Sequence, residues 1–248
     1  MLSKEVQQLV MEALGTFALC YVGGWSVEWS FSGQASVTAV ALAHGFVLGL
    51  FVYLGASISG GHYNPAVSIS LYITGYQKLE DTIRYILAQC GGSILAGIVL
   101  YCLRPNWLIA MKTAQLGHPS LPDNVDTTVG FICEAIAAGT LVLCVFSAGV
   151  HKKAPDAVTA TMVGCSLLIG VLSIGNTTGA ALNPARVLGP AILSGRVGER
   201  GHMIYYFGPI VGGMVASLLY KYFFIKTFPI KKNRVIDDKA EKPYIVDN

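Results

Sequence analysis

Two segments of the chain, at residues 59–67 (SGGHYNPAV) and 178–186 (TGAALNPAR), carry the side chains best suited to bind a small polar molecule. Each contains the same triplet, formed by Asn64, Pro65 and Ala66 in the first segment and by Asn183, Pro184 and Ala185 in the second. An Asn followed by Pro suits the first turn of a helix, where the Asn oxygen caps free backbone N–H groups. The Asn amide can then donate hydrogen bonds beside the positive end of the helix dipole. This chemistry orients neutral polar molecules and repels cations.

Three further polar side chains accompany these motifs. Glu12 and Glu134 each precede a motif by a similar interval, at the start of an apolar stretch. We expect both carboxylates to accept hydrogen bonds from the motif backbone and to brace it, with proton transport as the alternative. His62, beside the first motif, is expected to brace the same region near the mouth of a pore rather than to bind a metal ion.

The sequence offers little for catalysis or for nucleic-acid binding. The five histidines lack the spacing of a metal site, and no nucleophile stands beside a base. A net charge of +3 over 248 residues is too small to indicate a nucleic-acid partner. We therefore expect no enzyme activity, no metal and no cofactor. The six cysteines fall within apolar stretches, which argues against a disulfide framework.

The composition is that of an integral membrane protein. Hydrophobic residues make up 53% of the chain and charged residues 12%, and the mean hydropathy is +0.57. A bilayer core about 30 Å thick requires roughly 20 apolar residues per helix. Six such stretches are present, at residues 8–25, 35–57, 83–103, 128–150, 158–175 and 203–225. The first is expected to be retained as a membrane span rather than cleaved as a signal peptide.

The charged residues predict the orientation of these spans. Six spans place both termini on one side, and that side collects most of the lysines, including Lys4, Lys78 and the cluster at residues 226–234. The positive-inside rule then places the termini in the cytoplasm. Residues 231–248 are polar and charge-rich, and we expect a mobile cytoplasmic tail there.

The motif repeat predicts how the spans are arranged. Each half of the chain reads as span, span, short motif segment, span, with repeat one at about 8–104 and repeat two at about 127–225. An odd number of spans per half inserts the second half upside down relative to the first. The motif segments, 66–73 and 185–193, are too short to cross a bilayer and are predicted to be half-helices. The expected fold is an all-α membrane protein with six transmembrane helices and two half-helices in an inverted repeat, forming a single channel domain.

These features resemble the major intrinsic proteins, the aquaporins, over about residues 5–225. The paired Asn-Pro-Ala motifs, with an Arg three residues after the second Asn, carry the resemblance. The segments 41–45 (ALAHG) and 58–68 (ISGGHYNPAVS) are most similar to the aquaporin-8 type, also called aquaammoniaporins, and to the plant tonoplast aquaporins.

The resemblance implies a site, partners and an oligomeric state. It maps a selectivity filter onto His44, Val171, Ala180 and Arg186, with Arg186 excluding cations. This combination implies a passive channel for water, and for ammonia and hydrogen peroxide, in a homotetramer surrounded by lipid. A neutral His44 would accept from ammonia or donate to water, whereas a protonated one would add a second barrier to cations and lower conductance in acid.

Two other functions remain open on the sequence. Small side chains at Val171 and Ala180 would also suit a broader, aquaglyceroporin-like channel that passes glycerol or urea. A poorly conducting junctional or scaffolding membrane protein could have the same fold. Two further expectations concern the outer side: His118 in the loop 104–126 could lean over the filter, and Ala180 in place of a cysteine predicts insensitivity to mercury.

Overall fold

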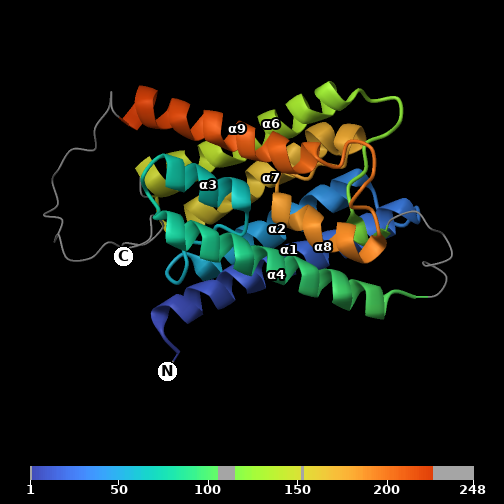
Figure 1. Cartoon of the computed structure of the whole chain (residues 1–248), viewed down its shortest axis with the longest axis horizontal. Coiled ribbons are helices and arrows are strands. Elements are labelled where there is room, and N and C mark those ends of the chain that lie inside the picture. Colours follow the sequence, from blue (N-terminus) through green and yellow to red (C-terminus); the bar gives the residue numbers. More distant parts are fainter. Residues whose placement is uncertain (1, 106–114, 152–153, 226–248) are drawn as a thin grey trace, which may run out of the picture.

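The chain forms a bundle of membrane-spanning helices around two short ones (Figure 1). The computed structural model describes residues 2–105, 115–151 and 154–225, so the predicted tail at 231–248 lies outside the described residues. The helices are α1 (Lys4–Phe31), α2 (Val37–Gly55), α3 (Pro65–Ile73), α4 (Leu79–Leu103), η1 (Gln115–Gly117), α6 (Thr127–Cys144), η2 (Val145–His151), α7 (Asp156–Thr178), α8 (Pro184–Ser194), α9 (Ile204–Leu219) and η3 (Tyr220–Ile225).

Six of these elements are long and apolar enough to cross a membrane: α1, α2, α4, α6 with η2, α7, and α9 with η3. The prediction of six spans and two half-helices is therefore confirmed. Helices α1, α4 and α7 run beyond the predicted apolar stretches, whereas α2 lies within its stretch. Ser3, Ser36 and Asp126 cap α1, α2 and α6, and each side chain accepts a hydrogen bond from a backbone N–H of the first turn.

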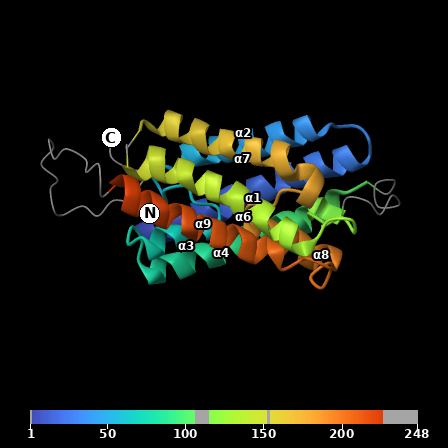
Figure 2. The same ribbon diagram turned by 90° about the horizontal axis from the view of Figure 1, so that it is seen from above.

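The two halves of the chain pack in equivalent ways. Helix α1 packs on α4 in the first half, as α6 packs on α9 in the second. Each half-helix lies against the other half, because α3 contacts α9 and α8 contacts α4. The half-helices lie toward opposite ends of the bundle (Figure 1 and Figure 2). This is the inverted repeat that the sequence predicts.

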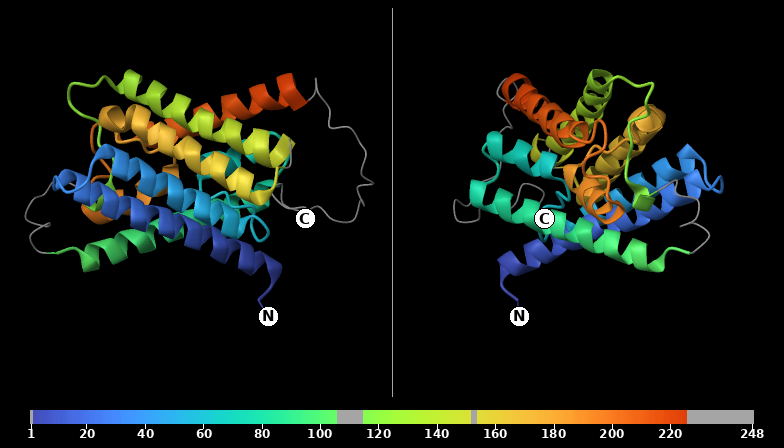
Figure 3. Two further views of the ribbon diagram at one scale, coloured as in Figure 1. Left: turned by 180° about the vertical axis from the view of Figure 1, so that it is seen from behind. Right: turned by 45° about the vertical axis from the view of Figure 1, so that its right-hand side comes forward.

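Glycines let the helices approach closely. A Cβ atom built on Gly45 of α2 would come 2.8 Å from the Gly164 carbonyl oxygen of α7. Gly92 of α4 and Gly212 of α9 take up equivalent positions, each against a backbone carbonyl of α1 or α6. Backbone contacts of this kind are typical of tight packing between membrane helices. Figure 3 shows the same bundle from behind and after a turn of 45°.

Candidate functional site: a lumen between two half-helices

The N-terminal tips of the two half-helices meet inside the bundle. Asn64 caps α3, with Oδ1 accepting from the Ala66 N–H at 2.9 Å. Asn183 caps α8 in the same way, accepting from the N–H of Ala185 at 3.0 Å and of Arg186 at 3.3 Å. A carboxamide has one oxygen and two N–H donors, so the caps leave the amide donors to point away from the helices.

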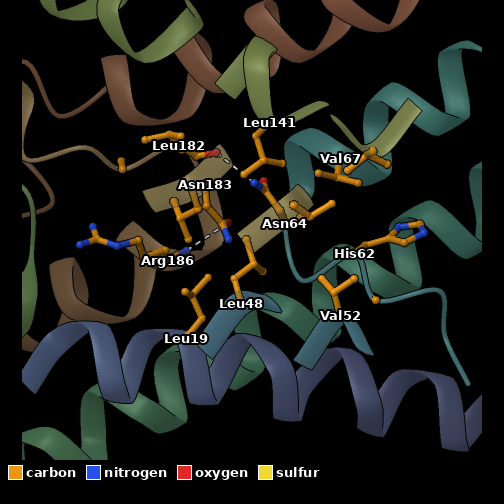
Figure 4. Close-up of a pocket in the computed structure, with 15 residues that line it drawn as sticks. Leu19, Leu48, Val52, His62, Asn64, Val67, Leu141, Leu182, Asn183 and Arg186 are labelled. Carbon is orange, nitrogen blue, oxygen red and sulfur yellow. Dashed lines mark hydrogen bonds between the residues drawn. The ribbon is translucent and has the colours of Figure 1, made fainter. Parts of the chain in front are cut away.

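Each Asn donates one of these N–H groups to the opposite half. Asn64 Nδ2 donates to the Leu182 carbonyl at 2.9 Å, and Asn183 Nδ2 donates to the Tyr63 carbonyl at 2.8 Å. Figure 4 shows the two side chains adjacent to each other. The crossed bonds thus use one N–H donor of each Asn and leave the other for the lumen. They also fix the distance between the half-helices.

The loops before the half-helices hold a strained backbone. Tyr63 and Leu182, which directly precede the two Asn residues, have φ values of 50° and 52°, and Ala180 has a φ of 50°. This left-handed conformation costs a residue with a side chain about 1–2 kcal/mol. It turns the Tyr63 and Leu182 carbonyls toward the opposite Asn. Other interactions must therefore hold the loops in place.

Glu12 holds the first loop. Its Oε1 accepts from the His62 N–H at 3.0 Å and from the Ser59 hydroxyl at 2.7 Å. Its Oε2 accepts from the Tyr63 N–H at 2.7 Å and from the Gln89 amide at 2.8 Å. The carboxylate is completely buried and all four partners are donors, so the geometry provides no position for a transported proton.

Glu134 holds the second loop by the same scheme. Its Oε1 accepts from the Thr178 hydroxyl at 2.6 Å and from the Ala181 N–H at 2.9 Å. Its Oε2 accepts from the Leu182 N–H at 2.8 Å. This carboxylate is also fully buried. Both glutamates therefore lie behind the motif loops, and neither lines the lumen described below.

Sequence reasoning missed several residues of this scaffold. Tyr85 and Tyr205 donate their hydroxyls, each at 2.8 Å, to the carbonyls of Ser59 and Thr178. The repeat could have revealed them, since the two tyrosines and the two hydroxyl residues are separated by nearly the same interval as the motifs. Gln89 has no counterpart of this kind and could be recognised only from the structure.

A narrow lumen passes between the Asn pair. Arg186 and His62 lie at its two ends, with Asn64 and Asn183 between them (Figure 4). The space open to the centre of a water molecule is only about 10 Å³, at the lower limit for holding one water. The remaining side chains of the lining are mainly apolar: Leu19, Leu48, Val52, Val67, Leu141, Val145, Val163, Leu167 and Leu182. A permeating molecule thus finds polar partners at few points.

A much wider vestibule lies outside Arg186. Its volume is about 320 Å³ by the same measure, and Arg186, Val171 and His118 all line it. Arg186 is the residue of the predicted filter that lines both cavities. Arg186 is 4% exposed, and its Nη1 has no hydrogen-bond partner among the described residues. Arg186 therefore marks the constriction where the vestibule narrows to the lumen.

His44 lies behind Arg186 and lines neither cavity. Its Nδ1 lies 2.9 Å from the Val40 carbonyl, which can only accept, so Nδ1 carries the proton. Nε2 accepts from Nε and Nη2 of Arg186 at 3.2 and 3.1 Å. Both ring nitrogens are thus occupied, and the expected exchange of hydrogen bonds between His44 and water or ammonia is not available in this geometry.

Ala180 and His62 lie apart from the contact between Arg186 and His44. Ala180 is fully buried and lines neither the lumen nor the vestibule. His62 lines the end of the lumen opposite Arg186, and its Nδ1 is 2.9 Å from the Ser68 hydroxyl. Its ring also packs edge-on against Tyr85. The structure therefore brings together Arg186, His44 and Val171 on one side of the Asn pair, and His62 on the other.

A buried carboxylate that the sequence did not reveal positions the outer loop. Glu28 of α1 is 1% exposed and accepts from the Leu116 N–H at 2.6 Å, with Arg104 Nε 3.8 Å away. His118, two residues after Leu116, lines the vestibule, and its Nε2 is 3.4 Å from His202 Nδ1. Burial, together with nearby His202, Arg196 and Arg186, lowers the pKa of His118 to about 3.

No cluster of three or more metal-ligating side chains occurs in the described part of the chain, and all six cysteines are free. The fold and the lumen together define a passive channel for small solutes.

Comparison with known proteins gives the family. The sequence pattern of the major intrinsic proteins matches residues 2–220. The chain is 33% identical over 225 residues to aquaporin A of Dictyostelium discoideum, covering 88% of this chain and 78% of that protein. It is 32% identical to aquaporin-4 of Rattus norvegicus, covering 89% of this chain and 67% of that protein. The chain belongs to the major intrinsic protein family, whose members are channels and not enzymes.

A solved structure supports the same assignment. The fold superposes on the aquaglyceroporin of Plasmodium falciparum with a TM-score of 0.81 and 25% sequence identity, over 90% of this chain and 98% of that one. The expected family and fold are thus confirmed. The particular similarity to aquaporin-8 and the plant tonoplast aquaporins remains a prediction.

Proposed function

We propose that the protein conducts water and other small neutral solutes, including ammonia and hydrogen peroxide, in single file through the lumen between Asn64 and Asn183. The observation that carries this proposal is the size of the lumen, about 10 Å³, between the polar ends at Arg186 and His62. A channel of this width excludes hydrated ions, because an ion would lose its water shell without replacement.

The Asn pair supplies the basis for excluding protons. Each Asn retains one N–H after the crossed bonds, and both lie at helix N-termini that carry about half a positive charge each. A water molecule passing there turns its oxygen toward both amides. Its neighbours are then oriented in opposite directions, which interrupts the relay that proton hopping requires. Arg186 adds a fixed positive charge at the constriction.

The choice of solutes beyond water rests on the constriction. Arg186, held to one side by His44, and the small Val171 leave a passage suited to solutes only slightly larger than water. The resemblance to aquaporin-8 and the tonoplast aquaporins favours ammonia and hydrogen peroxide. The likeness to a solved aquaglyceroporin supports a second candidate, a broader channel that also passes glycerol. A poorly conducting scaffold is the third.

We further propose that the protein is a homotetramer with cytoplasmic termini, each subunit forming one pore from the repeats at about 8–104 and 127–225. The lysines at the ends of the chain support this orientation. The tetramer rests on family membership alone.

Uptake of water, methylammonium, hydrogen peroxide and glycerol by one batch of proteoliposomes separates the candidates. We expect uptake of the first three above that of protein-free vesicles, with little glycerol. Glycerol uptake comparable to that of peroxide would support the broader channel, and uptake equal to protein-free vesicles for all four would support the scaffold.

A further inference from the structure

Helix α1 places Gly23 directly against the imidazole that holds Arg186. Gly23 is buried, and a Cβ atom built on it would overlap His44 Nε2 and lie 2.9 Å from both Cδ2 and Cε1 of the ring. Cβ atoms essentially never approach other heavy atoms below 3.0 Å. Only glycine therefore fits at this position while His44 keeps its place.

The imidazole cannot easily move to relieve such an overlap. Nδ1 is bound to the Val40 carbonyl one turn earlier on α2, and Nε2 accepts two hydrogen bonds from Arg186. The ring is completely buried, and protein interiors leave little free volume for a shift. A side chain at position 23 would also crowd the very atom that binds the guanidinium. A side chain at position 23 would thus disturb the hydrogen bonds that hold Arg186.

Arg186 depends on His44 for its position. The Nε and Nη2 groups of Arg186 both donate to His44 Nε2, and its Nη1 has no partner in the described residues. Without His44 the three guanidinium nitrogens would have to find acceptors in the vestibule or the lumen, both of which Arg186 lines. The guanidinium would then extend across the passage rather than along its side.

We propose that Gly23 is a specificity-determining residue of the channel, since its missing side chain leaves the space in which His44 holds Arg186 beside the path. This inference rests on the proposed function and deepens it. A methyl group at position 23 displaces the imidazole, releases the guanidinium into the constriction and narrows the channel for solutes wider than water.

A cycle of four proteins tests the proposal: wild type, Gly23→Ala, His44→Ala and the double variant. The readouts are the ratio of hydrogen peroxide to water permeability in proteoliposomes and the unfolding temperature in detergent. We expect Gly23→Ala in the wild-type background to lower this ratio by about threefold or more and to lower the unfolding temperature. In the His44→Ala background the same change should alter neither readout, because the imidazole that it would contact is absent.

Gly91→Ala is the matched control. Gly91 lies exposed on α4, and a Cβ atom built there has no heavy atom within 4 Å, so this change should leave both readouts as in wild type. The proposal is overturned if Gly23→Ala behaves like Gly91→Ala, or if its effect is the same with and without His44. Wild-type vesicles that pass neither solute would refute the proposed function, and with it the role in specificity, while the unfolding cycle would still show whether the two residues collide.

Discussion

The substitution Glu134→Gln tests how the second half-helix is held. Glu134 accepts three hydrogen bonds, from the Thr178 hydroxyl and the N–H groups of Ala181 and Leu182. A glutamine has a single acceptor oxygen, so even in its best orientation its amide N–H₂ faces at least one of these donors. The backbone at Leu182 loses its acceptor while it remains in the left-handed conformation.

The expected cost follows from these contacts. A buried backbone N–H without an acceptor costs about 1–3 kcal/mol, and the remaining bonds lose the benefit of a charged acceptor, about 1 kcal/mol each. The sum is about 3–5 kcal/mol, which corresponds to a fall in unfolding temperature of roughly 10 °C for a chain of this size. Water permeability should fall as well, because the Leu182 carbonyl binds Asn64 across the lumen.

The assay is thermal unfolding in detergent together with osmotic shrinkage of proteoliposomes. Glu5→Gln serves as the control, since that side chain is 72% exposed and its ion pair with Arg84 is long, at 3.8 Å. Exposed pairs of this kind contribute little. If Glu134→Gln unfolds within 1–2 °C of wild type, the carboxylate does not act as the acceptor described above, and the reasoning is refuted.

Four further predictions concern the outer side of the channel. Arg186→Val should admit glycerol and small cations, measured by uptake and by ion leak, and an unchanged solute profile would contradict the assignment of Arg186 as the barrier. Permeability should stay level between pH 5 and 8, because a proton on His44 Nε2 would face the Arg186 donors; a loss in acid that His44→Ala removes would contradict this. Stability should instead be full above about pH 6.5 and fall as the pH approaches 3, because the unfolded chain protonates His118 before the folded one does. Thermal unfolding at pH 7.5 and 5.0 should show a smaller acid effect in His118→Gln than in wild type. Mercury should not inhibit water permeation, because Ala180 provides no thiol before the second motif and Cys20 is buried. Inhibition by mercury that Cys20→Ala abolishes would contradict this.

The sequence predicted the architecture because that information is local or repeated. Apolar stretches located all six spans, and the largest differences lie at both ends of α1 and at the start of α4, where polar residues extend the helices. The Asn-Pro-Ala repeat located both half-helices within one residue at each end. The same repeat predicted that Glu12 binds the first motif loop and that Glu134 binds the second.

The parts that the sequence did not predict depend on contacts between distant segments. His44 and Arg186 are 142 residues apart, and only the fold shows that the ring accepts from the guanidinium. Glu28 has no signal in the sequence, because its partner Leu116 reaches it only when the outer loop folds back over α1. The crossed bonds of the Asn side chains were missed for the same reason, since their acceptors belong to the opposite half.

Osmotic water permeability, measured by stopped-flow light scattering over a range of temperatures, is the most direct test of a single-file lumen between the half-helices. The account predicts that vesicles containing the protein shrink much faster than protein-free vesicles of the same lipids, with a weaker dependence on temperature. Shrinkage at the rate and temperature dependence of the lipid alone would contradict it.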